Sequence, residues 1–197
     1  PVVGDRVFAV SANDGTNAGA AATVTVTVAA TDDTPTVSIV DGTPSFTESQ
    51  GSHAANNVTV INNAITLADL DTAALKSATV EITNVQAGDV LALDTSTHTK
   101  FDATLSGGVL TIAEKSGQTA STADLQAALR DVTFANTSDT PNNQARTIEF
   151  KVSDGNSTST AATESVAVTA TNDIPSFTFT DCLLYTSPSP RDKRLSR

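Results

Sequence analysis

The stretch Thr23-Val-Thr-Val-Thr-Val28, followed by the acidic connector Thr31-Asp32-Asp33-Thr34-Pro35, decides the fold of this chain. Valine and threonine alternate with period two, so the valines share one face of an extended strand and the threonines share the other. The proline that closes the connector fixes the backbone and has no N–H to donate to a strand ladder. The stretch therefore predicts a half-buried antiparallel strand that ends in a tight acidic linker.

The same arrangement recurs later in the chain, where Ser165-Val-Ala-Val168 leads into Thr171-Asn172-Asp173-Ile174-Pro175. The two connectors start at residues 31 and 171, which is 140 residues apart. A strand-and-connector unit that recurs at domain spacing indicates stacked modules. We therefore expect residues 1–35 to end one module, residues 36–175 to form a complete module, and residues 176–181 to begin another.

A hairpin precedes each connector, with an Asp-Gly pair at its turn. The segment Val10-Ser11…Asp14-Gly15 aligns with Val152-Ser153-Asp154-Gly155 if two residues are inserted in the first copy. Ile148, Phe150 and Val152 alternate with polar residues and are predicted to face inward. Asp14 and Asp154 are predicted to be turn residues rather than ligands, because Asp favours such turns.

Residues 36–175 contain many short alternating segments separated by turn signals, which is typical of an all-β antiparallel sandwich. One segment differs: residues 121–130 have good helix formers and a Ser/Thr cap, and predict a short helix near residues 122–130. Its apolar residues, Leu125, Ala128 and Leu129, share one face, and we expect the helix to lie across an open end of the sandwich. Strands are expected at 36–40, 45–48, 58–61, 65–67, 78–85, 90–93, 109–112, 132–134, 148–152 and 165–168.

The last residues differ from the rest of the chain. The segment Cys182-Leu-Leu-Tyr-Thr-Ser-Pro-Ser-Pro-Arg-Asp192 resembles a translated transposase-type sequencing adapter, and residues 182–197 are interpreted as a non-native tail. This tail holds the only Cys and the only Tyr. Subtracting its four basic and one acidic residue from the totals of 11 and 22 leaves 7 and 21, a net charge of −14. Such a charge argues against binding to nucleic acid or anionic lipid, because phosphate recognition needs basic patches.

The composition also limits the chemistry of the chain. Without the tail there is no cysteine for a disulfide or a thiolate site. The two histidines, His53 and His98, lie in polar, loop-like segments with no second His or Cys nearby, so we expect exposed residues rather than a zinc site. No phosphate loop, nucleophile elbow or zinc-protease motif is present, and no enzymatic activity is predicted.

Three motifs together resemble the bacterial cadherin-like tandem repeats of large secreted or surface-tethered calcium-dependent adhesins. They are the connector Thr171–Pro175, the hairpin Phe150-Lys-Val-Ser-Asp-Gly155, and the run Leu125-Gln-Ala-Ala-Leu-Arg-Asp-Val-Thr-Phe-Ala-Asn-Thr-Ser138. The resemblance covers residues 36–175 and the end of a preceding copy. It implies an immunoglobulin/cadherin-like sandwich in tandem, head-to-tail stacking, and Ca²⁺ bound where modules meet.

The resemblance also implies which residues are calcium ligands. Asp32 and Asp33 match the first connector, Asn172 and Asp173 match the second, and Glu48 matches a first-strand glutamate that faces the following connector. The remaining candidates, Asp69 and Asp71, match an Asp-x-Asp pair that reaches back to the preceding connector. The first connector has Asp32 where the family usually has Asn, and no Asp-Arg-Glu motif is found. We expect calcium at the first connector in particular, because the second has no following module in this sequence.

The residues themselves are compatible with this implication but leave an alternative open. Ca²⁺ prefers six to eight oxygen ligands, which clustered Asp, Asn and Glu can supply. Asp69 and Asp71 can point to one side of an extended segment, where two like charges favour a cation. The alternative is that the connectors are ordinary turns and the Asp pair a solvated loop.

The function implied is that of an extracellular, non-enzymatic extender module of a bacterial adhesin, stiffened by calcium and contacting neighbouring modules of the same chain. Other domains would contact cell-surface or matrix ligands. A first alternative is a module that itself binds polysaccharide or pairs with a copy of itself. The absence of Trp and of Tyr outside the tail disfavours the sugar ligand. A second alternative is an accessory domain of a large secreted enzyme.

Overall fold

The computed structural model describes residues 3–40, 42–49, 57–71, 74–175 and 177. The expected start of a further module (apart from residue 177), the tail and His53 lie outside this part. The chain is mostly β-strand, with one helix among the described residues. The strands are β1 (Gly4–Val10), β2 (Ala22–Val28), β3 (Thr36–Ser38), β4 (Ser45–Thr47), β5 (Thr59–Val60), β6 (Thr66–Ala68), β7 (Ser77–Ile82), β8 (Asp89–Ala92), β9 (Phe101–Ser106), β10 (Val109–Glu114), β11 (Thr133–Asn136), β12 (Arg146–Ser153) and β13 (Ala162–Thr169); the helix is α1 (Thr122–Arg130).

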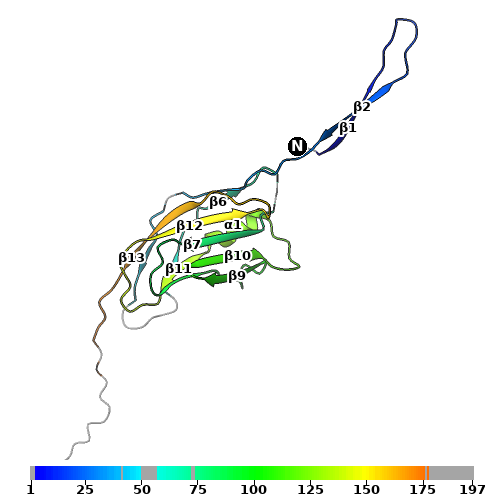
Figure 1. The fold of residues 1–197 in the computed structure, drawn as a ribbon. Coiled ribbons are helices and arrows are strands. Elements are labelled where there is room, and N and C mark those ends of the chain that lie inside the picture. The colour runs from blue at the N-terminus through cyan, green and yellow to red at the C-terminus, as the bar shows by residue number, and fades with distance from the viewer. Residues whose placement is uncertain (1–2, 41, 50–56, 72–73, 176, 178–197) are drawn as a thin grey trace, which may run out of the picture.

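The strands that follow the first connector form three sheets. A six-stranded sheet has the order β4-β13-β12-β7-β10-β9, a three-stranded sheet has the order β5-β11-β8, and β3 pairs with β6. Figure 1 shows β12, β7, β10 and β9 side by side. The core joins the two larger sheets: the ring of Phe46 on β4 meets the ring of Phe134 on β11 edge-on, with centroids 5.6 Å apart.

Alternation of apolar and polar residues decides which side chains enter this core. On β12, Ile148, Phe150 and Val152 are buried, as predicted. Strands β3 and β4 lie within the segments expected at 36–40 and 45–48, and they join different sheets. Strand β9, by contrast, was not expected from the sequence. It joins β10 through Gly107 and Gly108, which both have positive φ, as a tight two-residue hairpin requires.

The helix confirms the prediction from its cap. The hydroxyl of Ser121 accepts from the backbone N–H of Asp124, whose carboxylate accepts in return from the Ser121 N–H. Lys100, the Ser121 side chain and the Ser121 backbone hold the pKa of Asp124 well below its usual range. The predicted apolar face is buried, and α1 packs against β6 and β7. No helix of the described residues is long and apolar enough to cross a bilayer.

The β1–β2 hairpin differs from its predicted state. Its strands pair antiparallel, but Val24 and Val26 are 52% and 48% exposed, so the expectation of a half-buried strand is wrong for this chain. Figure 1 shows the hairpin beyond one end of the sheets, where no described segment covers its apolar face. The chain continues past β13 at the opposite end of the sheets.

The structure also corrects the alignment of the two hairpins. Arg6 pairs with Val26 and Arg146 with Val166, so each position recurs 140 residues later without an insertion. The bridges at the turns, Asn13 with Ala18 and Ser153 with Thr158, have the same spacing. A constant offset through both strands and the turn is a stronger internal repeat than the sequence alignment with two inserted residues.

Candidate metal centre

Three carboxylates converge at the second connector. Glu48, Asp139 and Asp173 each place an oxygen so that all three lie within 4.8 Å of one another. Among the described residues, this is the one set of three or more acidic, His or Cys side chains that gathers so closely. Glu48 is buried, Asp173 is partly buried and Asp139 is exposed. We refer to these three residues as the acidic triad.

Strand pairing positions Glu48, the residue that follows β4. Its N–H donates to the carbonyl of Thr169 at 2.9 Å, which extends the β4–β13 pairing by one step. Thr171 makes two hydrogen bonds to Glu48. Its N–H donates to Glu48 Oε2 at 2.9 Å, and its hydroxyl donates to the Glu48 carbonyl at 2.8 Å. The carboxylate is therefore held against the connector that carries Asp173.

The loop between β11 and β12, residues 137–145, brings Asp139 to the same place. The N–H of Thr137 donates to the carbonyl of Gly88 at 2.9 Å, which ties the start of the loop to the residue before β8. Near its end, Asn143 Oδ1 accepts from the N–H of Ala170 at 2.7 Å, beside the connector. The loop is thus fixed at both ends, with Asp139 between the two ties.

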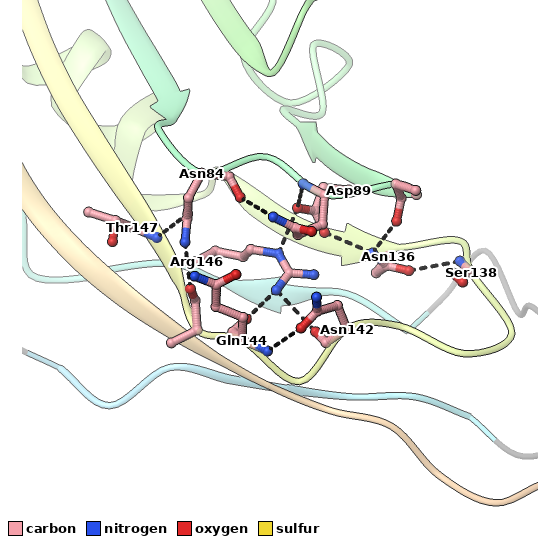
Figure 2. A network of polar contacts seen from close by, with 12 residues as sticks. Asn84, Asp89, Asn136, Ser138, Asn142, Gln144, Arg146 and Thr147 are labelled. Carbon is pink, nitrogen blue, oxygen red and sulfur yellow. Dashed lines mark hydrogen bonds and ion pairs between the residues drawn. The ribbon is translucent and has the colours of Figure 1, made fainter.

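A buried ion pair at the base of this loop sets its path (Figure 2). Arg146 Nε donates to Asp89 Oδ2 at 2.7 Å, and neither side chain is exposed. Arg146 Nη1 also donates to the carbonyls of Asn142 and Gln144 in the loop. Asn136 Nδ2 donates to the second oxygen of Asp89 at 2.7 Å. The guanidinium therefore fastens the loop to β8 from inside the protein.

This network has little capacity to tolerate loss of a partner. Two opposite charges buried together are neutral as a pair, but removal of either leaves an uncompensated buried charge. Arg146 Nη2 is buried and has no hydrogen-bond partner among the described residues, so the arginine already keeps one donor unmet.

The four acidic residues predicted at the first connector also gather, but in a different way. The N–H of Asp33 donates to Asp71 Oδ2 at 2.9 Å, and the N–H of Asp71 donates to Asp69 Oδ1 at 3.0 Å. From the β12–β13 turn, Asn156 Nδ2 donates to Asp32 Oδ1 at 3.0 Å. The connector is therefore held by two separate parts of the segment 36–175.

Opposing influences act on Asp71. The N–H of Asp33 lowers the pKa of this carboxyl, but sharing a hydrogen bond with Asp69, partial desolvation, and the charges of Asp69 and Asp32 together raise the pKa above its ordinary value. The raised pKa reflects repulsion between the Asp71 carboxylate and the negative charges beside it, and binding a proton reduces this repulsion. A cation relieves the same repulsion.

The predicted ligands thus separate into two groups. At the first connector, hydrogen bonds link the Asp33 N–H to Asp71 and the Asp71 N–H to Asp69, and the charge of Asp32 acts on Asp71. At the second connector, Glu48 and Asp173 bring carboxylate oxygens together. Asn172 is exposed, and its amide donates to the carbonyl of Asp173 at 3.3 Å. The tighter cluster lies at the second connector, whereas the sequence favoured the first.

Asp139 was not predicted from the sequence. It begins the tripeptide Asp139-Thr-Pro141, which repeats the Asp33-Thr-Pro35 of the first connector. That identity was a usable signal. His98, expected to be exposed, instead shows only 12% of its side chain and places Nε2 2.9 Å from Asp131 Oδ2.

Comparison with known proteins finds no matching family model, no matching curated protein and no matching solved structure.

The acidic triad fits a hard cation. Its donors are all oxygens, with no nitrogen or sulfur that zinc or copper would favour, and carboxylates with carbonyls and water form the usual calcium shell. Glu48, Asp139 and Asp173 would hold such an ion, which would supply positive charge where three negative groups meet.

Proposed function

We propose that residues 36–175 form an immunoglobulin/cadherin-like sandwich that serves as a non-enzymatic extender module of an extracellular bacterial adhesin. Its tandem neighbours are modules of the same chain, and calcium at the connectors holds the modules in a fixed relation. The observation that carries the proposal is the acidic triad, because it joins the first part of the module, Glu48, to the connector through which the chain leaves, Asp173.

The repeated hairpin supports the tandem arrangement. Two hairpins with one register, each followed by an acidic connector closed by proline, are expected when one module follows another. The negative charges of Asp32 and Asp69 beside Asp71, which the Asp33 N–H contacts, support a cation at the first connector as well. Each module would then carry acidic groups at both ends.

The proposed extracellular location is compatible with the affinity that such sites usually have. Calcium sites of extracellular modules have Kd values of about 10⁻⁴–10⁻³ M, so the calcium outside a cell would occupy them. When a chelator removes calcium, the clustered carboxylates repel one another, and the connector loses the bonds to the ion that restrain it. With calcium, the connectors would stiffen and the array would hold a distal adhesive domain away from the cell.

Calcium-dependent stability tests this function. At about 10 mM calcium, a site with a Kd of about 10⁻⁴–10⁻³ M stabilises the folded state by about 1.4–2.7 kcal/mol. Urea unfolding of the full chain in calcium and in chelator measures this gain. Asp139→Asn should remove about half of the gain or more, while Asp102→Asn, the same charge change on β9, should leave it intact.

The outcomes separate clearly. A free energy of unfolding that is equal in calcium and in chelator overturns the calcium role. A gain that Asp139→Asn does not reduce places the ion elsewhere. Magnesium should not replace calcium, because it gives up its water reluctantly and demands near-octahedral geometry.

A further inference from the structure

A cavity of about 360 Å³ lies beside the start of β4. Residues 40 and 42–44, which precede β4, line it together with residues 60–64, which begin at the end of β5. The volume is at the lower end of the range of about 300–1,000 Å³ that small-molecule sites span. Part of the lining is apolar, from Val40, Val60 and Ala64, and can contact the carbon chain of a small ligand.

A buried carboxylate lies directly behind the residues that line the cavity. Glu164 on β13 is only 5% exposed. The N–H of Gly42 donates to Glu164 Oε2 at 3.3 Å, and Asn62 Nδ2 donates to the same oxygen at 2.5 Å. Both donors belong to the cavity lining. A methyl carbon added at Gly42 would lie 3.6 Å from this oxygen.

Asn62 ties the two lining segments to each other. Its side chain is nearly buried, and Nδ2 also donates to the carbonyl of Val40 at 2.9 Å. Its Oδ1 accepts from the N–H of Ala64 at 2.8 Å. The wall beside Glu164 is therefore fixed before any ligand enters, which lowers the entropic cost of binding.

Glu164 occupies an inward position of β13, where the strand pattern predicts an apolar residue. Glu164, Val166 and Val168 are buried, and the residues between them are exposed. In the repeated hairpin, Val24 holds the position that is equivalent to Glu164, because the offset of 140 residues applies through both strands. The hairpin pattern therefore does not require a carboxylate at this position.

No ion pair of the described residues includes Glu164. Its third donor is the N–H of Ser165, 3.2 Å from Oε1, so all three printed donors are neutral groups. Glutamate is almost never this buried unless it is paired, because an isolated buried charge is costly. A cation in the adjacent cavity would reduce this cost, and the net charge of −11 attracts cations to the protein.

The remaining acceptor capacity of Glu164 favours one kind of cation. A carboxylate has about four acceptor positions, and three are in use here. A primary ammonium group can bind through a single N–H, whereas a guanidinium binds best through two parallel bonds. A divalent cation prefers about six or more oxygen ligands, which suits this single, largely occupied carboxylate poorly.

We propose that this cavity binds the primary ammonium group of a small aliphatic amine. Glu164 supplies the counter-charge, and Val40, Val60 and Ala64 contact the carbon chain. The proposal does not rest on the calcium function, because Glu164 belongs neither to the acidic triad nor to the connectors.

Titration of the ¹⁵N-labelled full chain with pentylamine, followed by NMR, tests the site. At about pH 7 the amine is protonated, because alkylammonium groups titrate near pH 10. In chelator and about 150 mM KCl, which screens weak surface attraction, the amide signals of Gly42, Ala64 and Ser165 should shift together with a Kd of about 10⁻³ M. Pentan-1-ol, which has the same chain without the charge, should bind about tenfold more weakly or less.

Three variants locate the interaction. Glu164→Gln removes the charge at nearly constant shape and should weaken pentylamine binding about tenfold or more. Gly42→Ala keeps the charge but places a methyl group beside the carboxylate, with no contact shorter than 3.4 Å, and should weaken binding to a similar extent. Glu81→Gln makes the same charge change on β7, away from the cavity lining, and should leave the Kd unchanged.

Each outcome decides for or against the site. Losses in Glu164→Gln and Gly42→Ala with an unchanged Glu81→Gln support it, and Gly42→Ala alone decides if Glu164→Gln does not fold. Equal binding of pentylamine and pentan-1-ol, an unaffected Kd in Gly42→Ala, or no shift at about 20 mM amine overturns it. Displacement of the amine by calcium, or tighter binding of Nα-acetyl-lysine N-methylamide, would assign the cavity to a metal or to a protein lysine and would overturn the small-amine ligand.

Discussion

The β1–β2 and β12–β13 hairpins share one register and one turn, yet their side chains lie in opposite environments. Asp14 Oδ1 accepts from the N–H groups of the residues two and three positions ahead, at 2.9 and 2.8 Å, and Asp154 Oδ1 does the same at 2.7 and 2.8 Å. The glycine after each aspartate has positive φ, at 95° and 104°. The local sequence is therefore sufficient to specify the hairpin.

Burial separates the two copies. Phe150 is fully buried on β12, whereas Val10, its counterpart on β1, is 59% exposed. The three-stranded sheet and α1 complete the core around β12, and no described segment does so for β1. The comparison teaches that alternation gives a strand its two faces, but other strands decide whether the apolar face is buried. Equivalent substitutions in the two hairpins can therefore measure the effect of burial alone.

The largest difference in stability between the two hairpins is expected for substitution of the equivalent arginines, Arg146 and Arg6. Arg146→Met should lower the free energy of unfolding by about 3–5 kcal/mol, because Asp89 remains buried and uncompensated. Arg6 is exposed, so Arg6→Met should change the free energy of unfolding by no more than about 0.5 kcal/mol. Urea unfolding followed by circular dichroism measures both.

A second substitution distinguishes charge from packing. Arg146→Met combined with Asp89→Leu removes both charges and should recover part of the loss, although Asn136 then lacks one acceptor. If the double variant is as unstable as the sum of the single variants, the arginine acts by packing and the ion-pair explanation is wrong.

A smaller difference is expected for the same apolar substitution at equivalent positions. Val166 is fully buried and Val26 is 48% exposed. Val166→Ala removes two methyl groups from a closed core and should cost about 2–3 kcal/mol, while Val26→Ala should cost no more than about 0.5 kcal/mol. Similar losses in thermal or urea unfolding would mean that the β1–β2 hairpin is covered in solution.

The sequence predicted most of the fold for reasons that are local. The helix was visible from Ser121 and the spacing of Leu125 and Leu129, and the buried strands from their alternation. Strand β9 was not predicted, although Phe101, Ala103 and Leu105 alternate with polar residues and were a usable signal. It is an edge strand, and edge strands are often polar.

The candidate site was predicted only in part for a different reason. Glu48 and Asp173 belong to motifs next to strands, so their neighbourhood follows from strand order. Asp139 lies in a loop whose path depends on the buried Arg146–Asp89 pair. Long-range placement of this kind has no periodic signal in a single sequence.

A smaller effect is expected for the contact between the tip of the β12–β13 hairpin and the first connector. Asn156 contacts Asp32, and Thr16 holds the equivalent position in β1–β2. Asn156→Ala removes this bond, so the connector should open more readily and the Asp33 N–H should exchange roughly two- to fivefold faster. Thr16→Ala should leave that exchange rate unchanged. Hydrogen exchange followed by NMR reads both, and equal rates in the two variants would show that the tip does not restrain the connector.

The smallest effect is expected in the titration of the two turn aspartates. The N–H groups of Asn17 and Thr16 hold the pKa of Asp14 below its ordinary value, and those of Ser157 and Asn156 do the same for Asp154. A lowered pKa in the folded state contributes stability that is present above the ordinary value of about 3.9 and is lost as the pH falls through the folded value. Both carboxyl groups should therefore titrate below about pH 3.9 in NMR spectra.

The consequences of that titration should differ between the hairpins. Protonation weakens both turns, but packing against the core keeps β12 paired with β13, whereas β1 and β2 rely on their own bonds. In acid, cross-strand NMR contacts should therefore fade between Asn13 and Ala18 before they fade between Ser153 and Thr158. Ser157→Ala, which removes a side-chain bond to Asp154 alone, should raise only that residue's midpoint. If both turns open together, the core does not protect β12–β13, and the contrast between the two hairpins fails.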